Sequence, residues 1–318
     1  MTPLQAVSTA EAEKAARAAR ADSPREALRA FMDAVGFNED AVSAALHLTG
    51  KQGGGQVRQY LDGERDDLDE LVTDFLRLDG IEVLPTRNLA IVFKVCDHAH
   101  RRGQINVVAS RSGFGKTTGL LAYARTKGAV YVSHDKTASR LEFLVNLLAA
   151  AGVHWNHLGS TAARIRRFTS RMIELGRPLL IVDEADTLTF ACLEIARTIN
   201  DRVRGGLILA GIDGYVQPML LRAGHGFRPE QAAGRVAAIV RLPDPDADDV
   251  ARLAGEYGVN APTAILFLVE RAAVLGGLRR VRVLLDDAKE IAEAQRMRSI
   301  TIACLKEAAN YVPEDAGR

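Results

Sequence analysis

Residues 105–118 read INVVASRSGFGKTT, and this stretch decides the fold. The apolar run Ile105–Ala109 is typical of a buried strand, and Gly113 and Gly115 then allow a tight turn before a helix-forming segment. A glycine-rich loop between a strand and a helix turns its backbone N–H groups toward a bound phosphate. Lys116 supplies a charge for the phosphates, and Thr117 supplies a hydroxyl for Mg²⁺. The stretch therefore predicts a P-loop with ATP and Mg²⁺ as cofactors.

The whole loop is expected to contact the nucleotide, although its first residue departs from the usual pattern. A P-loop normally begins with glycine, and here that position is Ser110. Lys116 is also expected to act in catalysis. The predicted nucleotide-binding residues of the loop are Ser110, Arg111, Ser112, Gly113, Phe114, Gly115, Lys116, Thr117 and Thr118.

Two adjacent acids follow the most apolar strand pattern of the chain, Leu179–Val182. An acid at the end of a central parallel strand reaches the sheet edge where ligands bind in open α/β folds. Asp183 is therefore predicted to hold Mg²⁺ through a water molecule, with Thr117 as the direct ligand. Glu184 is predicted to polarise the attacking water.

Two arginines are further catalytic candidates. Arg279 follows Gly276-Gly277-Leu278 at the start of a predicted helix, from which it could reach the γ-phosphate. Arg235 precedes the predicted strand 237–242 and could act on the nucleotide of a neighbouring subunit. Arg228 and Arg241 remain alternatives for this second role.

The order of patterns along the 318 residues predicts four parts. Residues 1–22 are expected to be a flexible segment, and residues 23–79 a small helix-turn-helix-like domain with a flexible turn over 49–55 and a last helix over 68–78. Residues 80–243 alternate between helix and strand patterns, which predicts an α/β core with a parallel sheet. Only helical patterns follow in 244–318, which predicts a helical lid.

Charge and cysteine content limit the possible partners and the compartment. The formal net charge is only +1, so DNA binding would need local basic patches. The candidates are Arg164, Arg167 and Arg171, which share a face of a predicted helix, with Lys51 and Arg58 in the N-terminal domain. The three cysteines have no paired spacing and are predicted to be buried in a reducing compartment. Without a signal pattern or a long apolar run, we expect a cytoplasmic protein with no membrane partner.

The ordered combination of P-loop, strand-end acids and helical lid resembles the AAA+ ATPase family. Within it, the chain resembles the transposition B proteins of Mu-type phages and related transposon ATPases. This narrower resemblance rests on the helix-turn-helix region, on the segments 84–87, 180–185 and 206–211, and on the order in which they occur. It adds Pro85 to the expected nucleotide contacts. It also implies ATP-dependent, largely sequence-independent binding to double-stranded DNA as a homo-oligomeric filament or ring, which delivers target DNA to a transposase.

One position departs from the family pattern and keeps other functions open. The family usually has a polar γ-phosphate sensor where this chain has Ile212, so hydrolysis is expected to be slow unless Asp213 substitutes. The alternatives are an AAA+ helicase loader for DNA replication and an ATP-sensing helix-turn-helix transcription regulator. The sequence Asp-Glu-Ala-Asp at 183–186 is also found in helicases, but the helical patterns after residue 243 do not predict a second sheet domain.

Overall fold

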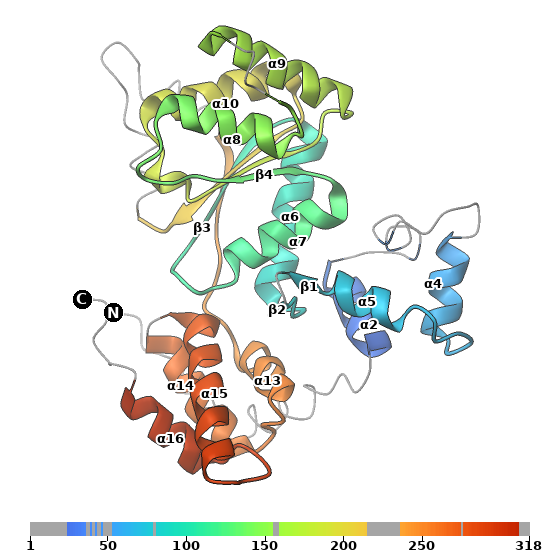
Figure 1. Cartoon of the computed structure of the whole chain (residues 1–318), viewed down its shortest axis with the longest axis vertical. Helices are drawn as coiled ribbons and strands as arrows, with labels where there is room; N and C mark the ends of the chain where they lie inside the picture. Colours follow the sequence, from blue (N-terminus) through green and yellow to red (C-terminus); the bar gives the residue numbers. More distant parts are fainter. Residues whose placement is uncertain are drawn as a thin grey trace. The chain divides into compact units, whose positions relative to one another are not determined.

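The computed structural model describes residues 24–35, 39, 42, 46, 53–78, 81–154, 159–214, 236–274 and 276–311 (Figure 1). The contacts divide the chain into two units. The sheet unit comprises 91–110 and 116–242. The helical unit comprises the part before residue 91, the loop segment 111–115 and the part after residue 242.

A parallel five-stranded sheet forms the centre of the sheet unit. The strand order is β4-β5-β6-β3-β7, so β3, which leads into the P-loop, lies between β6 and β7. The α/β core with a parallel sheet that the sequence predicts is confirmed. The strands are β3 (Ile105–Ser110), β4 (Val130–Ser133), β5 (Leu180–Asp183), β6 (Leu207–Ile212) and β7 (Val236–Arg241).

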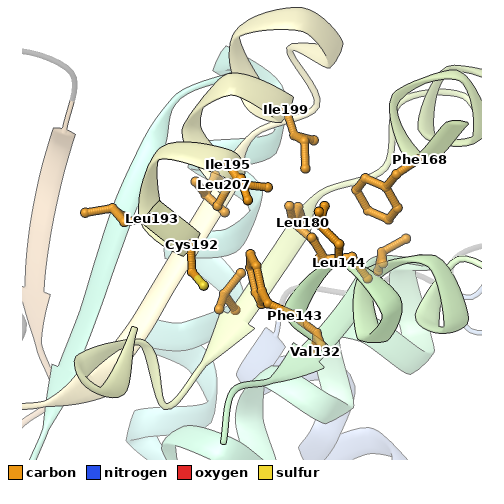
Figure 2. Packing of buried hydrophobic residues seen from close by; sticks show 14 of the residues in the cluster. Val132, Phe143, Leu144, Phe168, Leu180, Cys192, Leu193, Ile195, Ile199 and Leu207 are labelled. Carbon is orange, nitrogen blue, oxygen red and sulfur yellow. The ribbon is translucent and has the colours of Figure 1, made fainter. Parts of the chain in front are cut away.

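One hydrophobic core lies on one face of this sheet, under α8 (Arg140–Ala150), α9 (Thr161–Glu174) and α10 (Phe190–Val203) (Figures 1 and 2). Figure 2 shows side chains from α8, α9 and α10 meeting those of the strands, such as Phe143 and Leu180. Alternate residues of each strand join this core, among them Val130 and Val132 of β4 and Leu180 and Val182 of β5. Because side chains alternate along a strand, Tyr131 and Asp183 point to the opposite face.

That opposite face carries α6 (Arg87–Arg102) and α7 (Lys116–Lys127). The two helices approach closely at Gly119, where an added Cβ would lie 3.2 Å from the Val92 side chain. Asn106 of β3 donates to the backbone oxygen of Val95, which ties α6 to the sheet. The α6/α7 face is thus the face to which Tyr131 and Asp183 point.

Four helices form the lid part of the helical unit: α13 (Ala247–Glu256), α14 (Pro262–Val274), α15 (Gly277–Ala294) and α16 (Ile302–Tyr311). Their inward faces form a separate core, against which Leu84 packs. Asp246 caps α13 by accepting a hydrogen bond from the Asp249 backbone N–H at 2.9 Å, as the side chain of an N-cap residue does. The predicted C-terminal helices are confirmed.

In the part of this region that the structure describes, the N-terminal helices are α2 (Pro24–Val35), α4 (Gly53–Leu61) and α5 (Asp69–Phe75). The prediction of a turn across 49–55 is wrong for its last three residues, because α4 begins at Gly53. Val57 and Tyr60 are fully buried, and such packing outweighs the poor helix propensity of glycine. Most of the predicted helix-turn-helix before Gly53, including Lys51, lies outside the described residues.

The prediction of one helix over 68–78 is also corrected. The helix α5 ends at Phe75, and β1 (Arg77–Leu78) then pairs antiparallel with β2 (Ile81–Glu82). Val83 donates its backbone N–H to Leu76, so the hairpin satisfies backbone groups that a longer helix would have paired within itself. Helical spacing alone could not indicate this pairing.

Two further predictions from the sequence concern the cysteines and membrane-spanning helices. Cys96, Cys192 and Cys304 are all buried, as predicted for cysteines that act as small apolar core residues. Among the described residues, no helix is long and apolar enough to cross a membrane.

Asp249 should make the stability of the helical unit depend on pH. Its carboxylate is 3% exposed and accepts the Arg87 backbone N–H at 3.0 Å. Burial, and then Asp246, raise its pKa from 3.8 to about 6. The folded protein therefore binds this proton more tightly than the unfolded chain does, so the fold gains stability as the pH falls through about 6 toward 3.8.

Above that range the ionised carboxylate destabilises the fold. Asp249→Asn keeps an acceptor for Arg87 and should raise the free energy of unfolding by about 1–2 kcal/mol at pH 8, with little gain at about pH 3, below both pKa values. Urea unfolding at the two pH values measures this difference. Asp248→Asn, one residue away and exposed, is the control. An equal gain at both pH values for Asp249→Asn would contradict the prediction.

Candidate nucleotide site

The P-loop lies where the sequence places it, between β3 and α7. Ser110 is the last residue of β3 and is 2% exposed, and Lys116 is the first residue of α7. Gly113 and Gly115 have φ values of +82° and +81°, in the left-handed region that glycine adopts without a Cβ penalty. The strand, loop and helix thus have the conformations that a phosphate cradle needs.

Two oxygen-bearing side chains meet at the start of α7. The Thr117 hydroxyl donates to Asp183 Oδ2 at 2.7 Å, and Asp183 is fully buried at the end of β5. Lys116, next to Thr117, is 8% exposed, so its stem is packed against the protein. Hydroxyl and carboxylate oxygens are ligands that suit Mg²⁺, and the first turn of a helix favours phosphate. The residues present therefore fit a Mg²⁺–nucleotide complex, with Thr117 and Asp183 on the metal side.

Glu184 has an unusual backbone at the end of β5. Its φ of 54° and ψ of 33° place it in the left-handed region, which non-glycine residues rarely occupy. The backbone N–H of Glu184 donates to Asp183 Oδ1 at 2.9 Å, and its carbonyl accepts from the Thr187 hydroxyl at 2.7 Å. These two hydrogen bonds fix the backbone of Glu184. Its half-buried side chain therefore leaves the backbone in a direction that an extended strand would not give it.

Residues 97–220, which include the P-loop, Asp183 and Glu184, match the family described as "AAA domain".

Residues 97–220 are thus similar to an AAA domain.

Two curated relatives are similar to this chain at low identity. The Mu-like prophage FluMu DNA transposition protein B of Haemophilus influenzae is 24% identical over 192 residues, which are 60% of this chain and 66% of that protein. The ATP-dependent target DNA activator B of Escherichia phage Mu is 28% identical over 177 residues, 55% of this chain and 56% of that protein. The chain thus spans between 56% and 66% of the length of these relatives.

Solved structures show the same fold. The ORC1 protein of Aeropyrum pernix, solved in complex with DNA, gives a TM-score of 0.55 at 18% identity over 75% of this chain and 68% of that chain. CDC6P of Pyrobaculum aerophilum gives 0.55 at 13% identity over 71% and 65%. At such identities the likeness concerns the fold alone.

The carboxyl end of β6, where the AAA domain has Ile212 and Asp213, is held by two carboxylates. Asp186 accepts the backbone N–H of Ile212 at 3.1 Å, and so links the turn after β5 to the end of β6. The Asp213 carboxylate accepts from Arg241 Nε at 2.9 Å. Asp213 would have to leave this ion pair to sense a γ-phosphate, and its negative charge opposes that role.

Within the helical unit, the tip of the P-loop packs against the start of α15. Arg279 Nη1 donates to the Ser112 hydroxyl at 3.5 Å, and the Arg111 guanidinium lies 5.8 Å from the Phe114 ring centre. The lid glycines approach the loop so closely that a Cβ on Gly277 would lie 2.5 Å from the Phe114 ring. The structure therefore brings Arg279 to the loop, while its proposed contact with phosphate stays a prediction.

The segment that contains Pro85 belongs to the same unit and is tied to the lid. The Pro85 carbonyl accepts from Arg252 of α13. Asn88, which is 2% exposed, donates to the carbonyls of Phe114 and Pro243, each at 3.0 Å. Asn88, Asp186 and Tyr131 are not among the site residues predicted from the sequence. The last of these lies on β4 and donates from its hydroxyl to Asp183 Oδ2.

Of the remaining residues predicted to act in catalysis or DNA binding, some are described by the structure and others lie outside the described residues. Arg235, Arg228 and Lys51 lie outside the described residues. Arg58 is 73% exposed and forms an ion pair with Glu39 at 3.8 Å.

The arginines of α9 are partly neutralised by an acid on the same helix. Arg167 and Arg171 both pair with Glu174, at 3.0 and 3.3 Å, and Arg171 Nε also donates to the Ala151 carbonyl. Arg164 is half-buried, whereas Arg166 is exposed. The face predicted from spacing therefore exists, but its charge is lower than the arginine count suggests.

Proposed function

We propose that this protein is an ATP-dependent DNA-binding ATPase that assembles on target double-stranded DNA and recruits a transposase. The proposal is carried by one observation: the similarity to the ATP-dependent target DNA activator B of phage Mu runs over 55% of this chain. The matched AAA domain and the hydrogen bond from Thr117 to Asp183 support nucleotide binding. Homo-oligomerisation and cytoplasmic localisation belong to the same proposal.

The side chains around the P-loop have separate roles in this proposal. Lys116 neutralises the β- and γ-phosphates, and Thr117 and Asp183 hold the metal ion. Bound Mg²⁺ supplies charge neutralisation to the transferred phosphoryl group. Glu184 orients a water molecule for attack, and Arg279 stabilises charge that develops on the γ-phosphate. Because Ile212 carries no polar group and Asp213 is paired with Arg241, hydrolysis is slow, and ATP acts mainly as an assembly signal.

DNA contact in this proposal is electrostatic and depends on local clusters, because the net charge is only +1. The basic face of α9, made of Arg164, Arg167 and Arg171, is the principal surface. Arg58 is a second contact, and Lys51 and Arg235 keep the DNA-binding and trans-acting roles assigned from the sequence.

The test of assembly is electron microscopy of the protein with duplex DNA of arbitrary sequence, with ATP or a slowly hydrolysed analogue. We expect filaments that need nucleotide and that are absent for Lys116→Ala, which lacks the phosphate charge. Addition of the cognate transposase should then increase strand transfer into the coated DNA. Tight binding to one palindromic site without filaments would replace the proposal with a transcription regulator.

The α9 face has its own test, because Glu174 competes for two of its arginines. A combined change of Arg164, Arg167 and Arg171 to alanine should weaken DNA binding at least about tenfold and reduce its salt dependence. Glu174→Gln should strengthen binding about two- to threefold, since it removes a carboxylate that repels phosphate and releases both arginines. Filter binding across several salt concentrations measures both effects. If neither variant changes DNA affinity, α9 is not the contact surface.

A further inference from the structure

The carboxylate of Asp183 has a hydrogen-bond partner that belongs to neither the P-loop nor its own strand. The Tyr131 hydroxyl of β4 donates to Asp183 Oδ2 at 3.1 Å. The same oxygen accepts from Thr117 at 2.7 Å, and Oδ1 accepts the Glu184 backbone N–H at 2.9 Å. Asp183 is thus anchored by a strand neighbour in addition to the nucleotide loop.

Sheet geometry explains why Tyr131 reaches this carboxylate. In the parallel register of β4 and β5, Tyr131 lies opposite Ile181 and Ser133 lies opposite Asp183. Val130, Val132, Leu180 and Val182 all enter the core under α8 and α10, so Tyr131 and Asp183 share the α6/α7 face. A tyrosine two residues earlier on the neighbouring strand has the length to reach across to the acid.

The three donors leave little freedom in how Asp183 can bind a further group. An ionised carboxylate offers about four acceptor sites, and three are filled by Thr117, Tyr131 and the Glu184 backbone N–H. Since Asp183 is fully buried, solvent does not supply other donors. One acceptor site therefore remains for the water of a bound metal ion.

The Tyr131 hydroxyl keeps its proton under ordinary conditions. Burial, and then the charge of Asp183, raise the pKa of Tyr131 above its ordinary value. Tyr131 therefore acts at neutral pH as a hydrogen-bond donor and not as an anion.

We propose that Tyr131 is a positioning residue for the metal ion, which orients Asp183 so that its remaining acceptor site faces a Mg²⁺-bound water. This inference rests on the proposed binding of Mg²⁺–ATP. Tyr131 contacts neither nucleotide nor metal, and acts only through Asp183. Partners that orient a ligating carboxylate commonly contribute about 10- to 100-fold to metal affinity. An effect at the lower end is expected here because a water molecule separates Asp183 from the metal.

The matched pair for the test is Tyr131→Phe and Tyr123→Phe. Tyr123 of α7 also donates its hydroxyl to a carboxylate, that of Asp97, at 3.0 Å. Both variants remove one tyrosine–aspartate hydrogen bond from the same unit, but only the first removes it from Asp183. Any general loss of stability should therefore appear in both.

The experiment titrates Mg²⁺ into full-length protein with a fluorescent ATP analogue, and measures Mn²⁺ binding by electron paramagnetic resonance. Tyr131→Phe should raise the half-saturating Mg²⁺ concentration, and the Mn²⁺ dissociation constant with nucleotide present, about tenfold. Its affinity for the analogue in excess EDTA should stay unchanged. Tyr123→Phe should leave all three values unchanged.

The outcomes separate this inference from the proposed function. If wild-type protein binds the analogue in a Mg²⁺-dependent way and Tyr131→Phe does the same at the same Mg²⁺ concentration, the positioning role is wrong. An equal loss of affinity with and without Mg²⁺ would show a purely structural role and would also overturn it. Wild-type protein that shows no Mg²⁺-dependent binding would overturn the proposed function and this inference together.

Discussion

Glu184→Gln is expected to lower ATP turnover at least about 100-fold while the affinity for ATP changes by less than about twofold. Glutamine keeps the size and shape of the side chain but cannot carry the negative charge that polarises an attacking water. The backbone of Glu184 is held by Asp183 and Thr187 through its N–H and carbonyl, so the new side chain should leave the turn in the same direction. The variant should therefore lose ATP turnover and keep its affinity for ATP.

The measurement combines steady-state phosphate release with a nucleotide-binding titration. Glu290→Gln is the control, because Glu290 is an exposed glutamate of α15 to which no role in nucleotide or DNA binding is assigned. Filaments formed by Glu184→Gln with ATP should persist, since the assembly signal is no longer removed. Unchanged phosphate release in this variant would show that another group activates the water.

Gly277→Ala is expected to destabilise the helical unit by about 2–4 kcal/mol and to weaken nucleotide binding. The new Cβ would lie 2.5 Å from Cδ1 of Phe114 and 2.8 Å from the backbone oxygen of Gly113. Phe114 is 3% exposed, so its ring has little room to move away. The φ of +51° at Gly277 adds the strain of a left-handed alanine.

Gly276→Ala provides the control, because its φ of +85° is also positive but the nearest atom to its Cβ is the Arg280 side chain at 3.2 Å. It should cost about 1–2 kcal/mol, from backbone strain alone. Chemical denaturation measures the free energy of unfolding, and a titration with an ATP analogue measures binding. If the two variants are equally stable, the packing of α15 on the loop tip does not contribute to the fold.

The loop tip and the lid contact each other within the helical unit. Gly113 and Phe114 are held by Gly276, Gly277 and Asn88, and Asn88 also bonds Pro243 at the start of the lid segment. The loop tip therefore lies against the start of α15, and Asn88 links it to Pro243, just before the lid helices. None of these contacts lies within one helix or strand, and local pattern analysis could not have found them.

The sequence by itself determined the strand–loop–helix of the P-loop, the strand that ends at Asp183 and the order of the described helices and strands from α6 onward. These features depend on local spacing: apolar runs for strands, three- and four-residue periodicity for helices, and glycine for left-handed φ. These patterns involve residues only a few positions apart, so they can be recognised without knowledge of the tertiary structure.

Only the tertiary structure decided which side chains contact the residues of these motifs. Tyr131 on β4 donates to Asp183 at the end of the neighbouring strand β5, and Asp213 is held by Arg241. It also decided that Gly53 begins a helix, since burial of Val57 and Tyr60 outweighs glycine's propensity. Hydrogen bonds, ion pairs and burial depend on distances between residues far apart in the chain, and a single sequence contains no direct record of those distances.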